Sequence, residues 1–244
     1  MYSIQLYGDR GMRIQFGNTI DRQVNENVHR FGNLLETYPI SGVEEWIPAY
    51  TAITIYYNPS EITYRELEKQ LTHLQKIMEE AEPPIARKII IPVCYEKEFA
   101  LDLEDVATYS NLSIQEVIRL HTEPLYHVYM MGFMPGFPYL GGLPEKLATP
   151  RLENPRKLVE QGAVGIADKQ TGIYPLASPG GWRIIGKTPV HLYDAKKEKK
   201  ILIKAGDTLQ FEPIDVSTYF EIEEAIQNGD YQPEIREEKG DNPS

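Results

Sequence analysis

The stretch 181–188, Gly-Trp-Arg-Ile-Ile-Gly-Lys-Thr, has the residue types and spacing of a phosphate-binding loop, G-x-x-x-x-G-K-[ST]. In such a loop the lysine and the hydroxyl group stand in the first turn of a helix, whose backbone N–H groups face the anion. Here Pro189 follows Thr188 and disfavours helical backbone before it. The next segment, Pro-Val-His-Leu-Tyr, alternates like a strand. We predict two neighbouring strands joined by a turn at Gly186-Lys187, with Lys187 an exposed cation; a nucleotide-binding loop is the alternative.

Residues 132–183 combine many glycines and prolines with aromatic rings, arginines and hydroxyl groups. Glycines let the backbone approach a ligand, rings form walls, and arginines hold a carboxylate or phosphate in a fork. The side chains that fit these roles are Phe133, Phe137, Tyr139, Tyr174, Trp182, Arg151, Arg156, Arg183, Gln170 and Ser178. A barrel whose turns simply need glycine and proline is the other interpretation, and composition does not decide between them.

The histidines and the cysteine offer less chemistry. The five histidines form no H-x-H or H-E-x-x-H pair, so the sequence predicts no metal site. His127, beside the glycine-rich segment, is the best candidate for a general base, and a structural role is its alternative. Cys94 lies in an apolar segment, where packing is expected rather than reaction. A single cysteine allows no internal disulfide and fits a reducing cytoplasm.

Charge and hydropathy restrict the possible partners. The chain has 244 residues and a net charge of -11, which would repel nucleic acid. No apolar run approaches the roughly 18 residues of a membrane span. The first residues lack the basic region and apolar run of a secretory signal. We therefore expect a cytoplasmic protein that binds neither nucleic acid nor membrane.

The first third of the chain predicts a small α+β domain over residues 1–86. Two short strands, 3–8 and 12–17, precede a helical pattern at 21–39 that ends at Pro39. Two further strands follow within 43–59, and Thr63 with Glu66 forms a capping box before a helix at 64–80. The order ββαββα places two helices on one sheet face. Residues 82–87, with Pro-Pro, predict a linker.

The rest predicts a mainly β domain over 87–232 and a flexible tail at 233–244. A buried strand, 88–95, is followed by two short helices within 101–122, separated near Asn111, the second opened by a Ser113/Glu116 capping box. Short apolar segments between glycines and prolines then indicate a sandwich or closed barrel. They are expected at 126–131, 163–167, 172–176, 182–185, 189–194, 200–206 and 208–214. A closing helix is predicted near 220–229.

Three long blocks, 126–151, 164–194 and 205–214, closely resemble the KipI family, also called allophanate hydrolase subunit 1-like. This family includes PxpB, one component of the three-component ATP-dependent 5-oxoprolinase. The likeness extends upstream to cover roughly residues 1–215. It implies a small α+β N-terminal domain followed by a mainly β, cyclophilin-like barrel domain.

The resemblance also implies an activity and partners. Together with an allophanate hydrolase subunit 2-like protein and a LamB/YcsF-like protein, the chain would convert 5-oxo-L-proline to L-glutamate while ATP is hydrolysed. ATP is used by the complex, and its binding by this chain is open. The alternatives are a KipI-type regulator that inhibits a sensor histidine kinase and a small-molecule binding protein related to urea carboxylase.

The family pattern is matched at most of the expected site. Tyr174, Ser178 and His127 are the catalytic candidates. The expected substrate or anion ligands are Arg151, Arg156, Gln170, Tyr139, Gly180, Gly181 and Trp182. The chain has Arg151-Leu152 where Arg-Arg is common, and the missing arginine weakens the expectation of an anion site. Glu96-Lys97-Glu98, Glu160-Gln161 and Asp168 also depart from the pattern.

Overall fold

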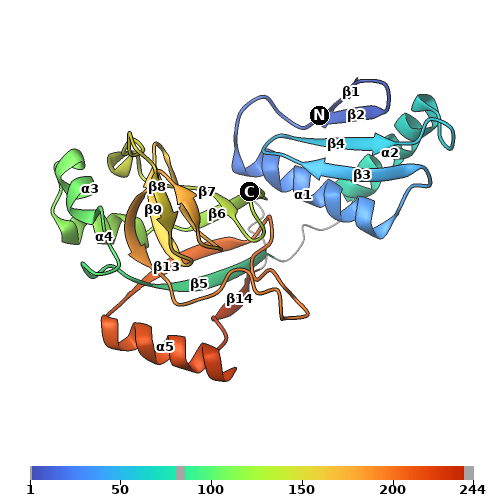
Figure 1. Ribbon diagram of the computed structural model, residues 1–244. Coiled ribbons are helices and arrows are strands. Elements are labelled where there is room, and N and C mark those ends of the chain that lie inside the picture. Colours follow the sequence, from blue (N-terminus) through green and yellow to red (C-terminus); the bar gives the residue numbers. More distant parts are fainter. Residues whose placement is uncertain (1, 81–85, 239–244) are drawn as a thin grey trace. The chain divides into compact units, whose positions relative to one another are not determined.

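The computed structural model describes two compact units, residues 2–80 and 86–238 (Figure 1). The predicted linker, 82–87, lies mostly outside the described residues. The first unit follows the order ββαββα that the sequence predicts. Its elements are β1 Ser3–Leu6, β2 Gly11–Gln15, α1 Arg22–Thr37, β3 Val43–Pro48, β4 Ala52–Tyr57 and α2 Tyr64–Glu80.

Local signals start both helices of the first unit. Asp21 accepts the N–H groups of Gln23 and Val24 at the start of α1. At the start of α2, the Glu66 carboxylate accepts the Thr63 N–H at 2.9 Å, as a capping box does. The apolar faces of both helices then pack on one face of the antiparallel sheet β1-β2-β4-β3. The core includes Val28, Phe31, Leu67, Leu71, Met12, Ile14, Ile53 and Ile55.

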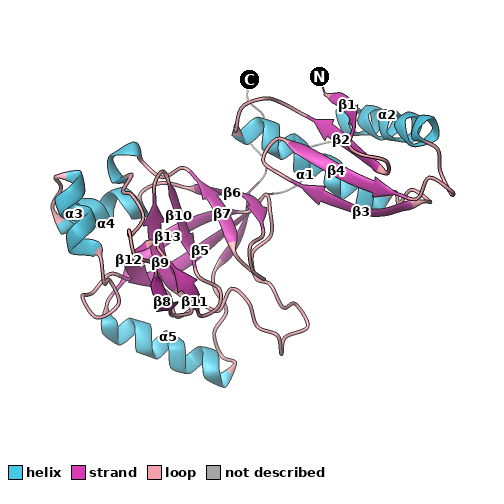
Figure 2. Ribbon diagram, turned by 45° about the horizontal axis from the view of Figure 1, so that its top comes forward, coloured by secondary structure: helices cyan, strands magenta, loops and turns pink. Residues whose placement is uncertain are grey.

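The second unit is mainly β, with helices at its margins (Figure 2). Its elements are β5 Ala86–Cys94, α3 Leu103–Ser110, α4 Ile114–Thr122, β6 Tyr126–Met131, β7 Pro138–Gly141, a 3-10 turn Glu145–Leu147, β8 Arg156–Val159, β9 Ala163–Ala167, β10 Gln170–Ile173, β11 Ser178–Gly180, β12 Arg183–Lys187, β13 Thr208–Ile214, α5 Val216–Asn228 and β14 Ile235–Glu238. As predicted, α4 opens with a Ser113/Glu116 capping box, and Asn111 between α3 and α4 has left-handed backbone.

The large sheet is nearly closed and barrel-like. Its strand order is β10-β9-β12-β5-β13-β6-β7, and the end strands β10 and β7 contact each other. The pair β5 and β13 is parallel, and the other neighbours in this order are antiparallel. The short pair β8 and β11 forms a separate sheet. Helix α5 packs against β5 (Figure 1).

Three local predictions are wrong. Gly186 and Lys187 lie within β12, where the pairing register with β9 shifts between Ile184 and Gly186 but the strand continues. The segments 189–194 and 200–206 are not ladder strands; they share the isolated bridge between Tyr193 and Ile201. Their alternation reflects burial alone, because Val190 and Leu192 fill the core while Pro189 has no N–H to donate.

The predicted tail is also partly ordered. Residues 235–238 form β14, which pairs antiparallel with the first half of β5. The sequence does not predict this pairing because the segment has charged side chains and no apolar alternation. Its stabilising contacts come from the backbone of β5, which is distant in sequence. The last residues of the predicted tail lie outside the described part of the chain.

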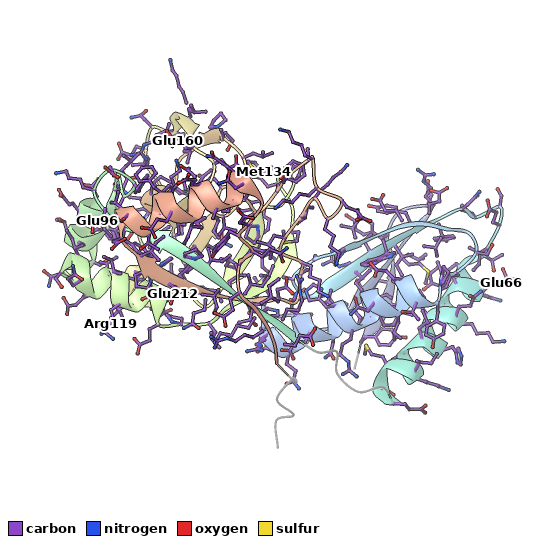
Figure 3. All side chains as sticks on the ribbon, turned by 90° about the horizontal axis from the view of Figure 1, so that it is seen from below. Glu66, Glu96, Arg119, Met134, Glu160 and Glu212 are labelled. Carbon is purple, nitrogen blue, oxygen red and sulfur yellow. The ribbon has the colours of Figure 1, made fainter. Side chains whose placement is uncertain are left out.

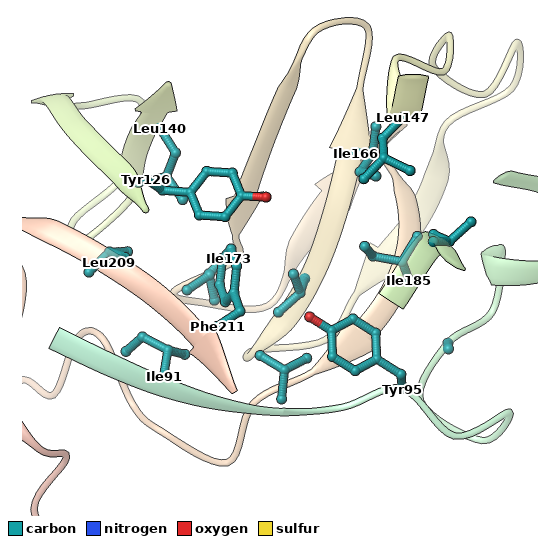
Figure 4. Close-up of a cluster of buried hydrophobic side chains, with 14 of the residues drawn as sticks. Ile91, Tyr95, Tyr126, Leu140, Leu147, Ile166, Ile173, Ile185, Leu209 and Phe211 are labelled. Carbon is teal, nitrogen blue, oxygen red and sulfur yellow. The ribbon is translucent and has the colours of Figure 1, made fainter. Parts of the chain in front are cut away.

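Apolar side chains fill the interior of the barrel (Figure 4), and a chain of hydrogen-bonded polar groups lies among them. Thr171 Oγ1 donates to the Gly165 carbonyl at 3.0 Å. His121 Nε2, 2.9 Å away, must therefore donate to Thr171 Oγ1, and His121 Nδ1 accepts from the Tyr95 hydroxyl at 2.7 Å. The imidazole also stacks on Phe211. Burial lowers the pKa of His121 to about 3, so the ring is neutral.

Within residues 2–80 and 86–238, every helix is too short or too polar to cross a bilayer.

Candidate functional site

The aromatic residues that the sequence singled out lie together around Phe137. Its ring centroid is 5.6 Å from that of Phe133, 5.4 Å from Tyr139, 5.8 Å from Trp182 and 6.2 Å from Tyr174. All four contacts are edge-to-face, the favoured geometry for such rings. Phe133 is 74% exposed, so the cluster extends from the buried Tyr174 to the surface. We call these five residues the aromatic cluster.

Tyr174 is the most enclosed polar group of this cluster. Its hydroxyl accepts the backbone N–H of Trp182, and burial raises its pKa although Arg151 and Arg156 act in the opposite direction. The phenol is therefore protonated at neutral pH. Gly180 makes this packing possible, because a Cβ there would lie 2.3 Å from the Tyr174 hydroxyl oxygen.

Ser178 stands on β11, beside the aromatic cluster in sequence and opposite Val159 of β8. Its hydroxyl oxygen is buried and has no hydrogen-bond partner among the described residues. Buried hydroxyl groups are nearly always hydrogen-bonded, so this one marks a place where a partner is missing. Gly180 ends β11, and Gly181 lies between β11 and β12.

The arginines expected to bind an anion already face carboxylates. Arg156 donates through both terminal nitrogens to Asp102, at 2.9 and 2.7 Å, and Asp102 also accepts the Ile184 N–H at 2.7 Å. Asp102 is buried, so this is a closed structural contact. Arg151 lies 3.4 Å from Asp168 in an exposed pair that a ligand can displace more easily.

Arg183 repeats the pattern, with Nη1 3.0 Å from Asp105 and Nε donating to the Pro150 carbonyl. The partners Asp102 and Asp105 are 54 and 78 residues from their arginines, and both lie at the start of α3. The sequence contained no signal for these long-range pairs.

Two other candidates lie away from Tyr174. His127 pairs with Gly141, whereas Met131, at the other end of β6, pairs with Pro138 next to Phe137. At about 3.3 Å a residue, His127 is some 13 Å along the strand from that end. Its ring is buried and edge-on to Tyr129. Gln170 begins β10 at the hairpin that also carries Asp168.

A pocket of about 270 Å³ adjoins the segment that carries Tyr174 and Ser178. The Gly162 N–H donates to the Tyr174 carbonyl at 2.8 Å, and Ala177, which precedes Ser178, lines the pocket. Its other walls come from the β8–β9 turn, the end of β12 and α5. The lining residues with polar or ionisable side chains are Glu160, Gln161, Lys187, Thr188, His191, Tyr219 and Glu223.

Lys187 is the cation of this pocket, and it is less exposed than predicted. Its side chain is 20% exposed, with Nζ 2.5 Å from Glu160 and 5.8 Å from the centroid of the Phe99 ring. The hydrogen bond and the charge of Lys187 lower the pKa of Glu160, so the Glu160 carboxylate is ionised at neutral pH. Lys187 ends a strand that no helix follows. This geometry confirms that 181–188 is not a phosphate loop.

Titratable groups elsewhere add no metal centre. Among residues 2–80 and 86–238, no group of three or more His, Cys, Asp or Glu side chains is placed to hold a metal ion. Burial raises the pKa of the Cys94 thiol, which keeps it unreactive.

These features define a class: a mixed α/β protein whose nearly closed barrel-like sheet presents an aromatic cluster and a small charged pocket at its surface. Comparison with known proteins identifies that class. A family model described as carboxyltransferase domain, subdomain C and D, matches residues 2–203, and the chain belongs to this family.

Two relatives extend the match. The chain is 42% identical to the 5-oxoprolinase B subunit of Bacillus subtilis (strain 168), over 89% of this chain and 95% of the relative. It is 39% identical to the 5-oxoprolinase B subunit of Escherichia coli O157:H7, over 85% of this chain and 94% of the relative. The predicted family resemblance is thereby confirmed.

A solved structure supports the fold. The Kluyveromyces lactis urea carboxylase aligns with 97% of this chain and 24% of its own, with a TM-score of 0.72 and 19% identity. At this identity the similarity concerns the fold alone.

Proposed function

We propose that this chain is one component of an ATP-dependent 5-oxoprolinase that converts 5-oxo-L-proline to L-glutamate. The observation that carries the proposal is the near full-length match, at 42% and 39% identity, to two proteins named as the B subunit of 5-oxoprolinase. The other components would be an allophanate hydrolase subunit 2-like protein and a LamB/YcsF-like protein.

The positions of the polar groups support an active site that this chain forms together with another component of the complex. The barrel interior is filled by packed side chains and by the closed chain through His121. On this unit, polar groups open to a ligand lie at the surface, in the pocket and beside the exposed Phe133. A surface half-site needs a second surface to exclude water, so we propose that the isolated chain is inactive or nearly so.

The chemistry requires electrostatic help. A lactam is a stabilised amide, and phosphorylation of its oxygen by ATP makes its carbon a better electrophile for water. Phosphoryl transfer from ATP to the lactam oxygen would release ADP. One water would then add to the ring carbon and the C–N bond would break, which leaves an amine and an acyl phosphate. A second water would hydrolyse the acyl phosphate to L-glutamate and inorganic phosphate. Donors placed where negative charge develops lower the barrier. The backbone N–H groups of Gly180 and Gly181, with Arg151, are the proposed donors on this chain.

The test is ATP hydrolysis driven by 5-oxo-L-proline in a mixture of the three components. We expect turnover to require this chain. Turnover that is unchanged when the chain is omitted would overturn the proposal and favour a regulatory role.

Three substitutions test the proposed site. Tyr174→Phe, Ser178→Ala and Arg151→Ala are each expected to lower turnover of the folded complex. For Arg151→Ala the loss should be about tenfold or more, because removal of one donor to developing charge costs at least that much. Tyr174→Phe and Ser178→Ala remove the two hydroxyl groups proposed to act in catalysis. Arg119→Ala is the control, because Arg119 forms an exposed pair with Glu123 on α4. If all three variants keep full activity in an assembled complex, the site lies elsewhere.

A further inference from the structure

The pocket beside Tyr174 has charges of both signs on different walls. Lys187 stands at the end of β12, Glu160 in the β8–β9 turn and Glu223 on α5 (Figure 3 labels Glu160 beside α5). Lys187 supplies one positive charge to the lining, and Glu160 and Glu223 supply two negative charges. A simple anion such as inorganic phosphate is therefore a poor fit. A molecule with an anionic group and a hydrogen-bond donor fits better.

Lys187 is suited to a ligand carboxylate. Its ammonium group is largely shielded from water and lies near the face of the Phe99 ring. Its partner Glu160 is 72% exposed, on a turn at the surface. Exposed carboxylates add little to the stability of such a pair, so a ligand carboxylate can take the place of Glu160 at little cost.

The α5 wall is suited to an N–H donor. Tyr219 is buried, and its hydroxyl donates to Glu223, whose charge together with burial raises the Tyr219 pKa. The phenol therefore remains protonated and holds the Glu223 carboxylate in place. Glu223 is half-buried and lines the pocket, where its other lone pairs can accept from a ligand.

The backbone fixes the size of the pocket. Gly162 has a φ of +82°, and a Cβ there would lie 2.3 Å from the Thr188 carbonyl oxygen. The Thr188 N–H also donates to the Gly162 carbonyl, so the turn is held against the end of β12. Ala177 and Pro189 supply apolar contact surface. A volume of about 270 Å³ is below that of most drug-sized sites and suits a small ring.

We infer that this pocket binds a small cyclic carboxylate that carries an N–H group, with the carboxylate on Lys187 and the N–H on Glu223. This inference rests on the proposed function for the identity of the molecule, 5-oxo-L-proline. It deepens that proposal by assigning the first binding of the substrate to this chain rather than to a partner. The pocket lining does not include the proposed donors Gly180, Gly181 and Arg151, which would act after the substrate leaves the pocket.

The test is direct binding of 5-oxo-L-proline to the purified full chain, measured by calorimetry and by amide chemical shifts. Saturable binding is expected, with shifts at Gly162, Ala177 and Lys187. Two probes dissect it: 2-pyrrolidinone lacks the carboxylate, and cyclopentanecarboxylate lacks the N–H. Each should bind at least about tenfold more weakly than 5-oxo-L-proline, as expected for loss of a charged hydrogen bond.

Two variants with opposite expected effects on binding distinguish a lost contact from a misfolded protein. Lys187→Gln should weaken binding about tenfold or more, whereas Glu160→Gln should strengthen it by removing the competing carboxylate. Lys76→Gln, at an exposed lysine of α2, should change nothing. Absent saturable binding, equal binding by Lys187→Gln, or equal binding of 2-pyrrolidinone would each overturn the inference. These outcomes are independent of the turnover assay, which tests the proposed function.

Discussion

Inside the barrel unit, His121 is held at both ring nitrogens by buried partners, whereas in the pocket Lys187 is held by one exposed carboxylate. The interior chain runs from Tyr95 through His121 and Thr171 to a backbone carbonyl. Each donor in it has an acceptor. By contrast, the Ser178 hydroxyl is buried without a partner among the described residues, and the Glu160 side chain is mostly in water.

This difference distinguishes polar residues that stabilise the fold from polar residues that are available to a ligand. A closed network specifies a fold, since every group lost from it leaves another unpaired in a medium of low dielectric. A group with a missing or replaceable partner contributes little to folding and is available to a ligand. Large losses of stability are therefore expected in the interior, and small ones in the pocket.

The largest expected effect is that of His121→Leu. The substitution leaves the Tyr95 hydroxyl without an acceptor and Thr171 without a donor, both buried. At about 1–3 kcal/mol for each such group, the free energy of unfolding should fall by about 4 kcal/mol. Urea denaturation of the full chain, followed by circular dichroism, measures it.

A triple variant is the control for that loss. Tyr95→Phe/His121→Leu/Thr171→Val removes every side-chain partner at once, so no donor remains unpaired. Most of the stability should return, because replacing all members of a buried polar set by apolar groups is often nearly neutral. If His121→Leu alone is as stable as the wild type, the interior chain does not hold the fold.

The interior chain also shows what the sequence could and could not predict. Local signals predicted the helices, because Thr63/Glu66, Ser113/Glu116 and Asn111 act within one turn. No local signal links His121 to Thr171, which is 50 residues away. The same limit hid the carboxylates that face the arginines and the pairing of β14 with β5.

The candidate site was predictable to a similar degree. Composition located the aromatic cluster, since the rings stand within one glycine-rich stretch. It missed the pocket, whose walls include Glu160, Tyr219 and Glu223, because these residues come from parts of the chain far apart in sequence. The weak match to a phosphate-binding loop drew attention to Lys187. It did not predict that Lys187 lines a pocket and pairs with Glu160.

Asp102→Ala should have the next largest effect. This buried carboxylate accepts two hydrogen bonds from Arg156 and one from the Ile184 N–H. Its removal leaves a half-buried guanidinium and a buried N–H unpaired, so the free energy of unfolding should fall by about 3 kcal/mol. The matched variant is Asp105→Ala, at the exposed partner of Arg183, which should cost less than about 1 kcal/mol. Equal losses in the two variants would contradict the distinction between closed and open contacts.

The pH dependence of stability gives a smaller effect with a definite sign. Folding lowers the His121 pKa to about 3, from about 6.5 in the unfolded chain. Between these values the unfolded chain binds one more proton, so the contribution of the neutral ring is complete above pH 6.5 and is lost as the pH falls toward 3. From pH 6.5 to 5 the wild type should lose about 2 kcal/mol more than the triple variant, at about 1.4 kcal/mol per pH unit. Parallel unfolding curves for the two proteins over this range would mean that His121 is protonated in the fold.

The smallest expected effect on stability belongs to Ser178→Ala. The hydroxyl is buried yet has no partner among the described residues, so its removal takes away a desolvated group and no hydrogen bond. The free energy of unfolding should change by less than about 1 kcal/mol, or rise. The same variant should lower turnover of the assembled enzyme, because the missing partner would be supplied by substrate or by another component of the complex. A loss of about 2 kcal/mol or more in urea, the cost of a broken buried hydrogen bond, would instead place Ser178 with His121 as part of a closed contact.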